Sequence, residues 1–119
     1  MRVEVEVCLK GDNVATTKVI EGVVRDASVW NEADVRTVLE GMLRAMHDAK
    51  HPEASVGAVS LRGLSWIVND FDEGGVVIAV EVTLGAAIAG PFQIDKASLE
   101  AMITRVIARP AEPPLNTVH

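Results

Sequence analysis

The chain has 119 residues, with 17 acidic against 11 basic side chains and a formal net charge of −6. A chain of this length can bury roughly two-thirds of its unfolded surface in one domain, so it needs neither disulfides nor a metal to fold. The negative charge would repel a phosphate backbone, and no lysine or arginine cluster offsets it. We therefore expect no nucleic-acid partner.

The chain shows no sign of export or membrane insertion. Its single cysteine, Cys8, cannot form an internal disulfide and fits a reducing compartment. Charged side chains at positions 2, 4 and 6 interrupt the stretch where a secretory signal would begin. The most apolar window, Val76–Ile94, is broken by Glu81, glycines and a proline, and its β-branched residues favour buried sheet. We predict a cytoplasmic protein without a membrane segment.

The N-terminal segment is predicted to form a hairpin. Valines at positions 3, 5 and 7 alternate with charged or polar residues, which is typical of a strand with one buried face. Turn-forming residues follow at 11–13, and the β-branched segment Thr17–Arg25 resumes the extended pattern. These two segments should pair as the first two strands.

A first amphipathic helix is predicted from Glu32 to about Lys50. Gly41 should cost this helix about 1 kcal/mol relative to alanine, which indicates a close approach to the sheet or to another subunit; a tolerated surface glycine is the alternative. Pro52 prevents much continuation of the helix. The apolar residues repeat at three- and four-residue steps and form one stripe: Val35, Val38, Leu39, Met42, Leu43 and Met46.

The second half is predicted to repeat this order. Segments 58–68 and 76–84 form a second hairpin around the polar loop 69–75, and an apolar stripe beginning at Leu99 predicts a helix that ends at Arg109 and Pro110. The small-residue segment 84–92 is interpreted as a packed turn or a pocket wall. Both predicted helices begin with the same kinds of residue at corresponding positions. An apolar residue precedes the capping residue, a polar residue follows the cap three positions later, and an apolar residue comes next: Trp30, Asn31, Asp34 and Val35 in the first helix, and Ile94, Asp95, Ser98 and Leu99 in the second.

These elements predict an α+β fold, a two-layer sandwich of order ββαββα. Its sheet is four-stranded and mainly antiparallel, with two helices on one face. Residues 1–109 form a single domain of two ββα units, about 1–50 and 56–109, and residues 110–119 form a flexible C-terminal tail.

Two helices can cover only one side of such a sheet, so the other side is expected to be the functional surface. We assign to it the third-strand set that contains Trp66, because that set also carries charge. One interpretation is pairing of two copies as a homodimer; another is a pocket for a small, cationic organic ligand. A pure protein-interaction module and a small enzyme with a carboxylate acid or base stay open, with no cofactor implied. The candidate ligand-binding residues are Trp66, Glu81, Arg62, Glu6 and Leu64.

Two weaker patterns are interpreted as structural. His47 and His51 have metal-ligand spacing, but no third ligand is fixed, and positive charge at a helix C-terminus explains them. Asp70, Asp72 and Glu81 match parts of a calcium-loop spacing, yet a glycine replaces the ligand at its fifth position and strands flank it. We predict an acidic hairpin turn there and no metal site.

Overall fold

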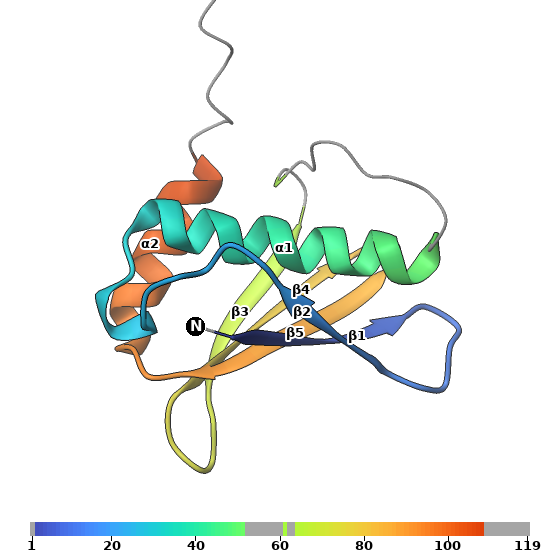
Figure 1. Cartoon of the computed structure of the whole chain (residues 1–119), viewed down its shortest axis with the longest axis horizontal. Helices are drawn as coiled ribbons and strands as arrows, with labels where there is room; N and C mark the ends of the chain where they lie inside the picture. The colour runs from blue at the N-terminus through green and yellow to red at the C-terminus, as the bar shows by residue number, and fades with distance from the viewer. Residues whose placement is uncertain (1, 52–60, 62–63, 109–119) are drawn as a thin grey trace, which may run out of the picture.

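The computed structural model describes residues 2–51, 61 and 64–108 (Figure 1). It has an antiparallel sheet with two α-helices packed against it, which confirms the α+β class. Neither helix combines the length and the apolar content needed to cross a bilayer, as far as the described residues extend. The elements in chain order are β1 (Val3–Leu9), β2 (Thr16–Ile20), a 3-10 turn η1 (Ala27–Val29), α1 (Glu32–Lys50), β3 (Ser65–Asp70), β4 (Val76–Val82), β5 (Gly85–Phe92) and α2 (Lys96–Ala108).

The sheet has five strands in the order β2-β1-β5-β4-β3, so the prediction of four strands was wrong. The strand that was missed, β5, lies at the centre and joins the N-terminal hairpin to the C-terminal meander. Within the described residues the second half of the chain is therefore βββα, in place of the predicted ββα order.

The small residues of β5 concealed it from sequence patterning, because glycine and alanine have low strand propensity. In the sheet those residues are needed for close packing. Gly85 has a positive φ of +153°, and a Cβ there would collide with the carbonyl oxygen of Cys8 on β1. Ala87 and Ala89 are buried between the sheet and the helices. The predicted buried sheet over Val76–Ile94 is thus two strands joined by a tight turn.

The remaining boundaries agree in part with the predictions. α1 has the predicted range, while β2 ends at Ile20 rather than at position 25. β3 begins at Ser65, and residues 58–60 and 62–63 of the strand predicted over 58–68 lie outside the described part of the chain. The polar loop after β3 is a hairpin turn, as predicted, closed by the Phe71 amide donating to the Gly75 carbonyl at 2.9 Å.

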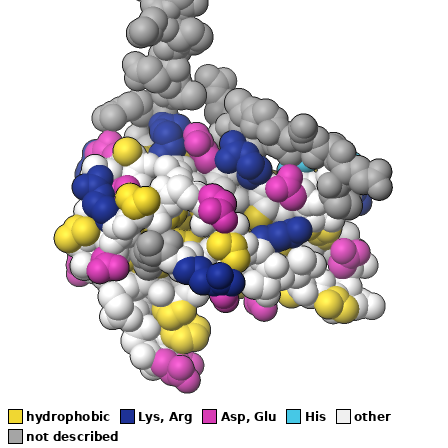
Figure 2. Space-filling view, viewed as in Figure 1, with side chains coloured by type: hydrophobic (Ala, Val, Ile, Leu, Met, Phe, Trp, Pro, Cys, Tyr) yellow, Lys and Arg dark blue, Asp and Glu magenta, His cyan; other side chains and the backbone are white. Residues whose placement is uncertain are grey.

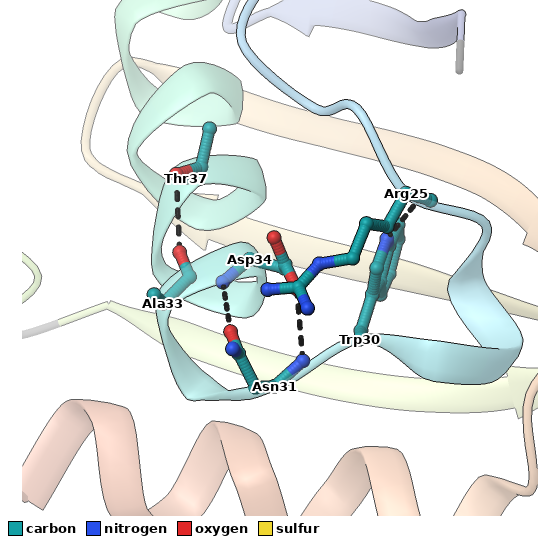
Figure 3. A network of polar contacts seen from close by, with 6 residues as sticks. All are labelled: Arg25, Trp30, Asn31, Ala33, Asp34 and Thr37. Atoms are coloured by element: carbon teal, nitrogen blue, oxygen red, sulfur yellow. Dashed lines mark hydrogen bonds and ion pairs between the residues drawn. The ribbon is translucent and has the colours of Figure 1, made fainter.

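Both helices begin at the predicted caps. At α1 the Asn31 side chain accepts from the Asp34 amide at 3.0 Å, and Asp34 accepts from the Asn31 amide at 2.9 Å, which completes a capping box (Figure 3). At α2 the Asp95 carboxylate accepts from the amide and the hydroxyl of Ser98, each at 3.0 Å. These bonds satisfy amide groups that a helix start leaves without partners.

The core lies between the helices and one face of the sheet. Helix α1 packs over β1, β2 and β5, while α2 packs over β3 (Figure 1). Gly41 on α1 lies against β2, since a Cβ there would be 2.5 Å from Cγ2 of Ile20. This contact confirms the predicted close approach and identifies its target as the sheet. The strand residues that fill the core alternate along each strand: Val3, Val5, Val7, Val68, Val76, Ile78, Val80, Ala87 and Ala89.

Candidate functional site

The predicted ligand-binding residues do not share one face of the sheet. Trp66 is directly opposite Val80, and Val68 is opposite Ile78, so Trp66 shares the face of two fully buried core residues. Leu64 packs against the same core. The assignment of the Trp66 set to the outward side was therefore wrong. The burial of Trp66 and Val68 determines which side of β3 is turned to the core, and the charge of Arg62 before the strand does not.

The predicted acidic residues lie on the opposite face. Glu6 on β1 and Glu81 on β4 are both exposed, and each alternates with buried residues of its strand. Arg62 lies outside the described residues. The structure thus separates the indole from the carboxylates that were expected to surround one ligand.

We call the face opposite the described helices the open face. Its side chains alternate with the core residues, and neither α1 nor α2 lies on it. Three of its aliphatic side chains are well exposed: Val19 at 40%, Ile67 at 52% and Ile88 at 44%. The open face consists of Thr17 and Val19 from β2, Glu4, Glu6 and Cys8 from β1, Ala86 and Ile88 from β5, Val77, Ala79 and Glu81 from β4, and Ser65, Ile67 and Asn69 from β3.

The open face has a shallow apolar depression of about 420 Å³ over β3, β4 and β5. Strand register explains its shape. Ala79 on β4 is opposite both Ile67 and Ile88, so a small side chain is flanked by two large ones. One step along the strands, Ala86 is opposite Glu81, which places a carboxylate at the end of the depression.

Carboxylates are the only charged side chains that the five strands place on the open face. Among the residues of the five strands, Lys18 is the sole basic side chain, and it is opposite Val5 and therefore on the helix-covered side. Just before β1, Arg2 donates to Glu4 at 3.1 Å. No ion pair within the described part of the chain engages Glu6 or Glu81. Basic and acidic side chains are instead interspersed around α1 and α2 (Figure 2).

The other candidate positions offer less. The rings of His47 and His51 are 5.0 Å apart, and Nδ1 of His47 is buried without a hydrogen-bond partner among the described groups. No group of three or more histidine, cysteine or acidic side chains in the described ranges is arranged to hold a metal ion. A larger depression of about 940 Å³ beside α2 has a mixed polar and apolar lining, and one of its two aspartates, Asp95, already caps the helix.

Sequence reasoning missed the aliphatic part of the open face. Ile88 belongs to the segment that was interpreted as a packed turn or a pocket wall, and Ile67 was assigned to the core because Trp66 was assigned outward. The sequence did contain a signal for this arrangement. Trp66 and Val68 are two positions apart and therefore share one face of a strand, which leaves Ile67 on the other face.

Comparison of the chain with known protein families, with curated proteins and with solved structures finds no significant match.

Proposed function

We propose that this protein is an interaction domain that binds a different protein through the open face of its sheet. The observation that supports this function is the combination of exposed aliphatic side chains with two carboxylates, Glu6 and Glu81, that have no ion pair among the described residues. Exposed apolar patches of this kind mark protein contacts, and complementary charge selects the partner. The partner surface is therefore apolar at its centre and positively charged around it.

The same charges argue against two simpler proposals. Pairing of two open faces in a homodimer would bring Glu6 and Glu81 of one copy against the carboxylates of the other, and like charges placed together oppose association. A small cation held between an indole and a carboxylate would need Trp66 and Glu81 on one side of the sheet, whereas they lie on opposite sides. The exposed carboxylates also lack the enclosed cleft that acid-base catalysis would use.

The function can be tested with two synthetic amphipathic helical peptides, one of leucine and lysine and one of leucine and glutamate. The protein is labelled with ¹⁵N, and amide shifts are followed during titration. We expect the lysine peptide to shift amides of β1, β4 and β5, and its binding to weaken as salt increases. Shifts confined to α1 and α2, or equal binding of the glutamate peptide, would contradict the proposal.

A pair of variants ties this binding to the open face. The double substitution Glu6→Gln and Glu81→Gln should weaken the lysine peptide by about fivefold to tenfold, as expected for two exposed charge pairs. Glu100→Gln on α2 removes the same charge from the helical layer and serves as the matched control. An equal loss in both proteins would show that overall charge, not the open face, attracts the peptide.

A further inference from the structure

We infer that the partner element on the open face is an α-helix with two basic residues seven positions apart and apolar residues three and four positions after the first. This inference rests on the proposed function and specifies the partner that the face would accept. It follows from the positions of Glu6 and Glu81 relative to the apolar depression. Neither carboxylate has an ion pair among the described residues.

The strand register gives the spacing of these carboxylates. Glu6 is opposite Ile88 and Glu81 is opposite Ala86, so β5 lies between the two acidic residues. Neighbouring strands are about 4.8 Å apart and alternate residues of a strand are about 6.7 Å apart, so the backbones at Glu6 and Glu81 are separated by about 12 Å on a diagonal. The midpoint of that diagonal falls on β5, between Ala86 and Ile88.

An α-helix laid along this diagonal matches both features. Its rise of about 1.5 Å per residue puts positions seven apart at about 10.5 Å on one side of the helix, and lysine or arginine side chains span the remainder. The residues three and four positions after the first basic residue then face the midpoint. One of them can enter the depression over Ala79 and Ala86, between Ile67 and Ile88.

A helix is also the element that covers a sheet face in this protein. On the other side of the sheet, α1 buries one apolar stripe against β1, β2 and β5. A partner strand, by contrast, gains its main-chain hydrogen bonds at a sheet edge and not on a face. Arg2 pairs with Glu4 at 3.1 Å, which leaves Glu6 and Glu81 as the charges that set the direction of the helix.

The test compares two helical peptides of identical composition, each with two lysines and the same leucines on one face. In the first peptide the lysines are seven positions apart around two leucines, and in the second they are four positions apart. We expect the first peptide to bind about fivefold more tightly, since only it engages both carboxylates at once. Circular dichroism should show a gain of helix when it binds.

Two variants assign the preference to particular side chains. In Glu81→Gln the two peptides should bind with equal affinity, while Glu100→Gln should keep the fivefold preference. Ala86→Val fills the end of the depression without changing charge and should weaken the first peptide. The unfolding midpoint of each variant in urea checks that the sheet is intact.

The possible failures are distinguishable. Equal binding of both peptides to the open face, or binding without a gain of helix, would overturn this inference and leave the proposed function in place. If neither peptide shifts the amides of the open face, the proposed function is overturned, and this inference with it. A second copy of the chain on that face, detected as a dimer that the peptides cannot displace, would overturn both.

Discussion

The two faces of the sheet are made by the same strands and differ in what lies against them. Ile78 on β4 is fully buried under the helices, while Ile88 on the neighbouring strand β5 is 44% exposed on the open face. Their side chains are chemically identical, and they are one residue apart in register. The comparison indicates that an aliphatic residue in this sheet contributes most to stability where a helix covers it, because only there is its apolar surface removed from water.

The matched substitutions Ile78→Ala and Ile88→Ala measure this difference most directly. Ile78→Ala leaves a cavity in the core and should lower the free energy of unfolding by about 2 to 5 kcal/mol. Ile88→Ala removes exposed surface and should cost less than about 1 kcal/mol. Urea denaturation of both variants gives the two values, and an equal loss would mean that Ile88 is buried in solution.

The face of the sheet that the helices cover was predictable because the two-residue period of the strands and the helical period of α1 indicate the same interior. Valines at every second position of β1 and the apolar stripe of α1 specify one interior, and the capping residues Asn31 and Asp34 fix where the helix starts. Each of these signals is local in the sequence. Each can therefore be interpreted without knowing which strands become neighbours in the sheet.

The open face was less predictable because its composition depends on strand neighbours. β5 was missed since its alanines and glycines have little strand propensity of their own; the strands on both sides hold it in place. Charge near β3 also suggested the wrong orientation for Trp66, whose large apolar ring gains more from burial. Of the predicted site, the structure leaves Glu6 and Glu81 together on one face.

Gly41→Ala tests how closely the covered face is packed. Alanine should favour the helix by up to about 1 kcal/mol, but its methyl group would meet Ile20 of β2 at 2.5 Å. Overpacking of this kind costs about 1 to 3 kcal/mol. We therefore expect a net loss of about 1 kcal/mol in urea denaturation, opposite in sign to the change at a surface glycine.

The background variant Ile20→Ala separates these two terms. With the isoleucine shortened, the added methyl group has space, and Gly41→Ala should stabilise the protein by up to about 1 kcal/mol relative to Ile20→Ala alone. If Gly41→Ala stabilises both backgrounds equally, the contact between α1 and β2 is looser than the structure places it.

Neutralising the open-face carboxylates should have the smallest effect on stability. Glu6 and Glu81 are exposed and have no ion pair among the described residues, so the double change to glutamine should alter the free energy of unfolding by less than about 0.5 kcal/mol. Its effect should appear in association instead. Without the charges, Val19, Ile67 and Ile88 remain as an exposed apolar surface with little to oppose contact between two copies.

Sedimentation velocity over a range of protein concentrations measures that association. The wild-type chain should stay monomeric where the double variant forms dimers, because pairing of two wild-type open faces would place the carboxylates of both copies in contact. Adding Ile88→Glu to the double variant should restore the monomer, which locates the dimer contact on the open face. A wild-type protein that already dimerises, and whose dimer is unaffected by Ile88→Glu, would place self-association elsewhere on the molecule and leave the open face for the cationic partner.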